Sequence, residues 1–205
     1  NLGSIQNTLG DNTAAEKSYL HAIALRPNYA EAHGNLGNAF CAMGHYKKAI
    51  TCYEEAITHK PKDANLHNSL GGALQELGRH SDAILCFTTA LSLAPKFAEA
   101  HSNLGISLKE KSQFDEALKS YELSLSIKPD FAEAHGNKGN VLKDLGLLDE
   151  AVSCYRKALT IRPNYTEVLC NLGSVLMSMG QLDEALSYFE STLAKKPDHR
   201  LAANN

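Results

Sequence analysis

Residues 30–63 read AEAHGNLGNAFCAMGHYKKAITCYEEAITHKPKD, and the same arrangement of residue types returns along the whole chain. The six prolines stand at 27, 61, 95, 129, 163 and 197, so that each step is 34 residues. Alanines keep the same step from Ala15 to Ala185, and glycines keep it from Gly3 to Gly173. A fixed period of this length indicates units that stack on one another rather than a domain with one central core.

Each unit predicts two helices joined by a short turn. Apolar residues recur at helical spacing around Leu36, and a second such stripe begins at Ala49. Gly44 lies between the stripes, where the end of a helix favours a left-handed residue. Pro61 ends the second helix because proline lacks the N–H donor and clashes with the preceding turn. Gly37 is small, as expected where the two helices approach closely. Three aspartates are placed to cap or charge-stabilise the start of the second helix: Asp115, Asp149 and Asp183.

The positions that recur resemble the tetratricopeptide repeat. The matching residues of the quoted unit are His33-x2-Leu36-Gly37-x2-Phe40, then Ala49-x3-Tyr53, then Pro61. The resemblance spans essentially the whole chain, with histidine in four units, and Leu169 in the last, at the family's usual Trp or Tyr position. It implies an all-α fold: a right-handed superhelical solenoid of antiparallel helix-turn-helix repeats with a concave and a convex side.

The repeat also predicts where the units begin and end. With proline as the thirty-second residue of the unit, we expect a single array over residues 1–205. Its parts are a partial repeat 1–29, complete repeats 30–63, 64–97, 98–131, 132–165 and 166–199, and the start of a further repeat at 200–205. Neither end shows a dedicated capping helix. We therefore expect the sequence to be a window from a longer array, and self-association through uncapped ends is a further hypothesis.

Composition argues against several classes of function. The net charge of −3 provides no positive field for nucleic acid or an anionic membrane. No apolar run approaches the roughly 20 residues that cross a bilayer, and no secretory signal opens the chain. The five cysteines form no Cys-x-x-Cys pair, so we expect no zinc, no cofactor and a reducing, cytoplasmic location. Phosphate-binding loops and nucleophile elbows are also missing, so this segment is not expected to be an enzyme.

One face of each first helix carries the candidate binding residues. Positions 6 and 9 of the unit share that face, position 12 lies nearby, and in the resembling family the face lines the concave groove. A carboxamide offers both donors and an acceptor, which suits the backbone of an extended peptide. Helices stack at roughly 8–10 Å and an extended chain advances about 3.3 Å per residue, so one asparagine would meet the guest about every third residue. The candidates are Asn35, Asn38, Ser69, Asn103, Lys109, Asn137, Asn140, Lys143 and Asn171.

This row of asparagines supports a closer resemblance. Its context, Ala-Glu-Ala-His-x-Asn-Leu-Gly, is similar to the repeat arm of O-linked N-acetylglucosamine transferases and related proteins, where an asparagine ladder holds protein substrates. Ser69 departs from the ladder and leaves a gap in it. The positions that match are Asn35, Asn103, Asn137 and Asn171.

Four functions follow as hypotheses. The first is a protein–protein interaction scaffold that binds an extended polypeptide segment, and the alternative is the substrate-recognition arm of a larger enzyme such as a glycosyltransferase. A clamp for acidic C-termini needs a basic cluster, but position 2 is mostly glutamate. RNA binding, as in pentatricopeptide proteins, favours a 35-residue step and basic surfaces, which this chain lacks.

Several residues at repeat positions need a separate interpretation. The histidines lie one repeat apart, roughly 10 Å, too far to share a metal ion, so we expect them to pack between hairpins. Lys138 replaces the leucine found at Leu36, and Lys111 occupies an apolar position beside Ser112, which breaks a glycine series. Either lysine is expected to extend its charged end to water. We expect a softer joint in the region from Lys111 to Lys138.

Overall fold

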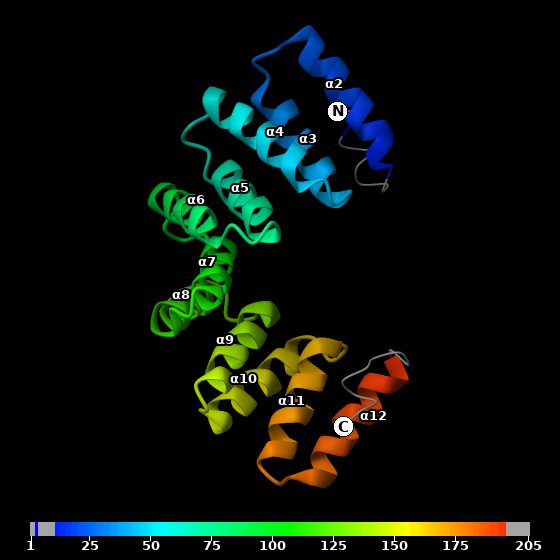
Figure 1. The fold of residues 1–205 in the computed structure, drawn as a ribbon, viewed down its shortest axis with the longest axis vertical. Helices are drawn as coiled ribbons and strands as arrows, with labels where there is room; N and C mark the ends of the chain where they lie inside the picture. Colours follow the sequence, from blue (N-terminus) through cyan, green and yellow to red (C-terminus); the bar gives the residue numbers. More distant parts are fainter. Residues whose placement is uncertain (1–2, 4–10, 196–205) are drawn as a thin grey trace. The chain divides into compact units, whose positions relative to one another are not determined.

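The computed structural model describes residue 3 and residues 11–195, and its secondary structure there is helical (Figure 1). The prediction of an all-α chain of helix-turn-helix repeats is confirmed. Most of residues 1–10 and the predicted further repeat at 200–205 lie outside the described residues. The helices are α2 (Asn12–Leu25), α3 (Ala30–Ala42), α4 (Tyr46–His59), α5 (Ala64–Glu76), α6 (His80–Leu93), α7 (Ala98–Glu110), α8 (Phe114–Ile127), α9 (Ala132–Asp144), α10 (Leu148–Ile161), α11 (Thr166–Ser178) and α12 (Leu182–Lys195).

The chain divides into two compact units, Asn1–Lys111 and Ser112–Asn205. In the first unit α3 pairs with α4 and α5 with α6, and α4 and α6 each pack on the helix that follows. In the second unit α9 pairs with α10 and α11 with α12, and α10 packs on α11. The first helices of neighbouring hairpins also touch: α3 contacts α5, α5 contacts α7, and α9 contacts α11. Within each unit, the first helices therefore form a continuous row.

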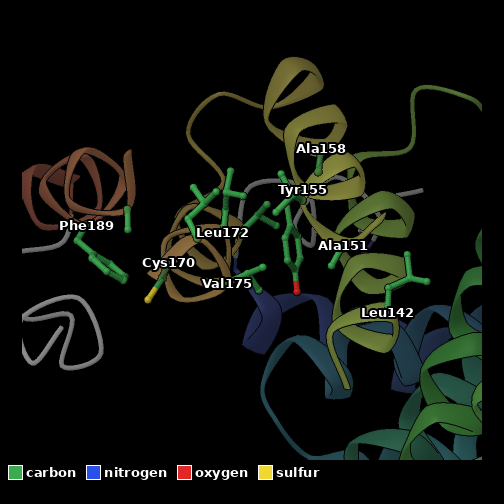
Figure 2. Packing of buried hydrophobic residues seen from close by; sticks show 12 residues of the cluster. Leu142, Ala151, Tyr155, Ala158, Cys170, Leu172, Val175 and Phe189 are labelled. Carbon is green, nitrogen blue, oxygen red and sulfur yellow. The ribbon is translucent and has the colours of Figure 1, made fainter. Parts of the chain in front are cut away.

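Each unit has its own hydrophobic core between the hairpins. In the second unit the cluster combines Leu142 of α9, Tyr155 of α10, Leu172 of α11 and Phe189 of α12 (Figure 2). The core of the first unit is built in the same way around Tyr19, Phe40, Tyr53, Leu74 and Phe87. No hairpin could bury these side chains alone, because both of its faces are apolar. Stability therefore comes from the interfaces between neighbouring hairpins.

A glycine in the first helix makes room for the aromatic ring of the second. A Cβ added at Gly37 would lie 2.6 Å from the ring of Tyr53, and one at Gly139 would lie 2.6 Å from the ring of Tyr155. Any larger residue would have to displace a buried ring. The expected close approach of the two helices at Gly37 is confirmed.

The turn inside each hairpin needs a left-handed residue. Gly44 has φ +73°, and the N–H of His45 donates to the carbonyl of Phe40 across 2.8 Å, which closes the end of α3. Gly78, Gly146 and Gly180 have similar φ values. The equivalent position in the repeat 98–131 is Ser112, which adopts φ +59° although it has a Cβ.

The predicted aspartates do not cap the second helices with their side chains. Asp115 and Asp149 lie in the first turns of α8 and α10, one residue past the helix start. The N-cap positions are held by Gln113 and Leu147, neither of which makes a side-chain cap hydrogen bond. Asp183 likewise lies in the first turn of α12. Of the two expected roles, these carboxylates perform the electrostatic one, in which they stabilise the positive end of the helix dipole.

The repeated histidines join successive hairpins. Each ring lies against the carbonyl of the proline that precedes it by six residues, at the end of the previous hairpin. Because a carbonyl only accepts, Nε2 is the donor. The expectation that these side chains pack between hairpins is confirmed. The Nε2···O distances are 2.8 Å for His33 and Pro27, 2.9 Å for His67 and Pro61, 3.0 Å for His101 and Pro95, and 2.9 Å for His135 and Pro129.

Lys138 of α9 directs its charged end toward the surface, as expected. Its Nζ donates to Oε1 of Glu122 on α8 across 2.8 Å. Only 21% of the lysine side chain is exposed, against 59% of the glutamate side chain. The aliphatic stem therefore takes part of the space that a leucine fills in the other repeats.

Candidate functional site

The candidate residues all lie on first helices, in two separate sets. Those of the first unit are Asn35 and Asn38 on α3, Ser69 on α5, and Asn103 and Lys109 on α7. Those of the second unit are Asn137, Asn140 and Lys143 on α9, and Asn171 on α11. Asn38 is exposed and the others are half-buried. We call the surface that these residues occupy the first-helix face of each unit.

A hollow of about 200 Å³ opens on the first-helix face between α3 and α5. It brings together three of the candidates, Asn35, Asn38 and Ser69. The two helices approach closely beside it, since a Cβ added at Gly34 would lie 2.9 Å from Cδ2 of Leu66. The hollow is lined largely by hydrogen-bonding side chains, including Asn65, which was not among the candidates.

A carboxamide pair joins α5 to α7 on the same face. Nδ2 of Asn103 donates to Oδ1 of Asn68 across 3.1 Å. Asn68 was not among the candidates, because the equivalent position holds Gly34 and Gly136 in other repeats. It stands directly before Ser69, the residue that interrupts the predicted ladder. The first helix of repeat 64–97 therefore also carries a carboxamide bonded to its neighbour.

The second unit also has a carboxamide pair between neighbouring first helices. Nδ2 of Asn171 on α11 donates to Oδ1 of Asn140 on α9 across 3.0 Å. The hydroxyl of Tyr155, from the second helix α10, donates to the same Oδ1 across 2.8 Å. The tyrosine therefore reaches from the interior of the hairpin to the first-helix face.

The first unit repeats this arrangement at Tyr53. Its hydroxyl donates to Oδ1 of Asn38 across 2.7 Å and lies 3.6 Å from Sγ of Cys41, a weaker acceptor. Burial raises the pKa of Tyr53 well above its ordinary value. Burial likewise raises the pKa of Tyr155. Both phenols are therefore neutral and able to donate at physiological pH.

Ion pairs flank the face near the ends of the hairpins. Nζ of Lys60 donates to Oε1 of Glu31 across 2.5 Å, and this hydrogen bond holds the pKa of Glu31 below its ordinary value. Arg162 and Glu133 form the equivalent pair in the second unit. In repeat 64–97 the same two positions hold Asn65 and Ala94, which carry no charge. Because the paired side chains are about half exposed, these pairs contribute little to stability.

The two candidate lysines stand apart from the carboxamide contacts. Nζ of Lys109 lies 3.6 Å from Oε1 of its neighbour Glu110. Burial raises the pKa of Cys170, and the positive charge of Lys143 opposes this effect only in part. Both lysines therefore add positive charge to first helices that also carry carboxamides, Lys109 on α7 with Asn103 and Lys143 on α9 with Asn140.

Burial keeps the cysteine thiols protonated. All five cysteines are free thiols, and burial raises the pKa of both Cys52 and Cys86 to about 11. Protonated thiols are poor nucleophiles and poor metal ligands. Within residues 11–195 no three His, Cys, Asp or Glu side chains gather as a metal site would require. The helices that the structure describes include none with the length and apolar character to cross a membrane.

Comparison with known proteins agrees with this architecture. The family model described as TPR repeat matches residues 3–44, 37–78 and 139–180, which together make up more than half of the chain. Models described as tetratricopeptide repeat match residues 64–97, 98–131 and 168–201. Among the curated proteins, none matches.

Solved structures share the fold along nearly the whole chain. MamA is 28% identical over 82% of this chain and 98% of its own, with a TM-score of 0.71. YrrB, described as a TPR protein with an unusual peptide-binding site, is 21% identical over 92% of this chain and 97% of its own, with a TM-score of 0.67. PilF of Pseudomonas aeruginosa is 20% identical over 99% of this chain and 92% of its own, with a TM-score of 0.86. Together with the repeat and the helical hairpins, the family models show that the chain belongs to the tetratricopeptide repeat family.

Proposed function

We propose that the chain is a protein–protein interaction scaffold that binds an extended polypeptide segment along its first-helix faces. The observation that carries the proposal is the placement of carboxamides on successive first helices. Asn35, Asn103, Asn137 and Asn171 occupy one position of the repeat, and Asn38 and Asn140 occupy another. The hollow between α3 and α5 adds a depression in which a guest side chain can be seated.

The chemistry of this face suits a peptide backbone. An extended chain presents alternating N–H and C=O groups, and each carboxamide can form a hydrogen bond with either kind of group. Contacts to the backbone give affinity with little dependence on sequence, so specificity falls to the side chains around the row. We infer that Ser69, Lys109 and Lys143 belong to this second group, since each differs from the carboxamides in hydrogen bonding or charge. The peptide-binding site in the description of YrrB, which shares this fold, also supports the proposal.

The alternative is that the same face serves as the substrate-recognition arm of a larger enzyme such as a glycosyltransferase. The resemblance of the asparagine context to such arms favours it, and the bound chemistry would be the same extended polypeptide. In either case we propose that this segment binds rather than catalyses, as one tetratricopeptide array in the cytoplasm. Association of such arrays end to end is a secondary proposal.

Peptide capture tests the proposed function. A displayed library of random linear peptides is selected on the protein, and one selected peptide is synthesised and titrated. Asn103→Ala and Asn137→Ala should each weaken binding roughly three- to tenfold, the worth of one hydrogen bond. The control is Asn164→Ala, which removes an exposed carboxamide from the loop after α10. If no peptide is captured, or if all three variants bind alike, the proposed function is wrong.

A further inference from the structure

Two of the tyrosines in the hairpin cores end on the first-helix face, and the sequence links them to particular asparagines. The repeats 30–63 and 132–165 combine asparagine at position 9 with tyrosine at position 24: Asn38 with Tyr53, and Asn140 with Tyr155. The repeats 64–97 and 166–199 have phenylalanine at position 24 and no asparagine at position 9. They combine Gly72 with Phe87, and Ser174 with Phe189. Where the hydroxyl is missing, the carboxamide is missing too, whereas the repeat 98–131 combines Tyr121 with Ile106 and so has the tyrosine without the asparagine.

The contacts explain this association. The hydroxyl of Tyr53 donates to Oδ1 of Asn38 across 2.7 Å, and the hydroxyl of Tyr155 donates to Oδ1 of Asn140 across 2.8 Å. Both rings are fixed, because Tyr53 is 2% exposed and Tyr155 is fully buried. Each ring also lies against a first-helix glycine. A rigid donor of this kind selects one orientation of a carboxamide that would otherwise rotate freely on the surface.

We propose that Tyr53 and Tyr155 are positioning residues, which hold Asn38 and Asn140 with their Nδ2 groups turned toward the bound polypeptide. At Asn140, Oδ1 accepts from the phenol and from Nδ2 of Asn171, so the group left for the guest is the Nδ2 donor. At Asn38 the phenol takes one of the two acceptor positions of Oδ1 and fixes which side of the carboxamide carries the Nδ2 donor. The repeats 30–63 and 132–165 therefore each bind a carbonyl oxygen of the guest backbone. The repeats with Phe87 and Phe189 have no such donor at this position. This inference rests on the proposed peptide-binding function and specifies which group of the guest backbone these two asparagines bind.

Fixing the donor in advance lowers the entropy lost when the guest binds. Without this hydrogen bond, the carboxamide of an asparagine at position 9 would rotate and present sometimes its oxygen and sometimes its amide group to the guest.

The test uses the synthetic peptide selected from the random library, titrated against four proteins. These are the wild type, Tyr53→Phe, Asn38→Ala and the double variant. Tyr53→Phe keeps the buried ring and should weaken binding roughly three- to tenfold. In the Asn38→Ala background the same substitution should change the affinity less than about twofold, because its effect passes through the carboxamide. A tyrosine with only a packing role would show equal effects in both backgrounds.

A second experiment tests whether rebuilding the pair in another repeat increases the affinity for the peptide. A Cβ added at Gly72 meets no other atom within 4 Å, so the helix has room there for a side chain to begin. Gly72→Asn together with Phe87→Tyr rebuilds the pair in a repeat that lacks it, and should bind the same peptide more tightly than Gly72→Asn alone. Equal affinities of these two variants, or an unchanged affinity in Tyr53→Phe, would overturn the inference while Asn103→Ala still reports on the proposed function. If the library yields no binder, both proposals fail together.

Discussion

Single residues decide how closely the helices of a hairpin can pack. Gly37, Gly71 and Gly139 stand where a Cβ would lie 2.6 Å from an aromatic ring of the second helix. Gly72 lies in the same helix as Gly71, but a Cβ there would meet nothing within 4 Å. The same residue type therefore has opposite roles at two adjacent positions.

This contrast gives a matched pair of variants. Gly37→Ala should destabilise the protein by about 1–3 kcal/mol, because the added methyl group displaces the ring of Tyr53 in a close-packed core. Gly72→Ala should stabilise it by about 0.5–1 kcal/mol, because alanine favours the helix and the site is open. Urea denaturation measures both changes. Destabilisation by both substitutions would show that the space around Gly72 is not available.

Ser112 is the second residue at which the backbone constrains the side chain. It adopts φ +59° where Gly44, Gly78, Gly146 and Gly180 stand in other repeats. Left-handed backbone costs a residue with a Cβ about 1 kcal/mol. Ser112→Gly should therefore raise the free energy of unfolding by about 1 kcal/mol, and Gly146→Ser should lower it by a similar amount. Thermal or urea unfolding of the two variants would contradict this account if both moved stability in the same direction.

At the scale of elements, contacts between helices compensate for departures from the repeat. Lys138 stands where other repeats have a leucine, and its charged end pairs with Glu122 on the neighbouring helix. Such a pair stabilises little, because desolvation of the lysine offsets much of the attraction.

Lys138→Leu tests this compensation. The leucine should raise the free energy of unfolding by about 1 kcal/mol, since it fills the site with apolar volume and leaves Glu122 in contact with water. Glu122→Gln should lower it by no more than about 1 kcal/mol, because the carboxylate is well exposed. The reverse order of the two variants in a denaturation series would mean that the ion pair itself stabilises the hairpin.

At the scale of the whole molecule, the chain divides into two compact units between Lys111 and Ser112. The strained Ser112 and the substituted Lys138 both lie in the region that the sequence predicts to be softer. We expect the amides of α8 to exchange with deuterium faster than those at matching positions of α4 and α10. Mass spectrometry of exchanged peptides gives the comparison, and equal protection in all three helices would contradict it.

The sequence predicts the fold in detail because the same structural signals occur in every repeat. The prolines, the turn glycines and the glycines equivalent to Gly37 each recur with the same period. The helix boundaries of one repeat therefore predict those of the others. The hydrogen bonds between side chains are harder to predict, since they join positions that no simple spacing rule connects. The bond from Tyr53 to Asn38 spans 15 residues. The pair of Asn103 and Asn68 joins unlike positions of two repeats, and the placement of Asp115 depends on where its helix begins.

The central claim is that a guest polypeptide lies on the first-helix faces. The most direct measurement is NMR of the ¹⁵N-labelled protein, followed through its backbone and side-chain amide signals while the selected synthetic peptide is added. We predict that the carboxamide signals of Asn35, Asn38, Asn103, Asn137 and Asn171 shift, and that the signal of Asn164 stays in place. Shifts confined to the second helices, around exposed residues such as Leu85 and Leu186, would place the guest on the opposite side and contradict the account.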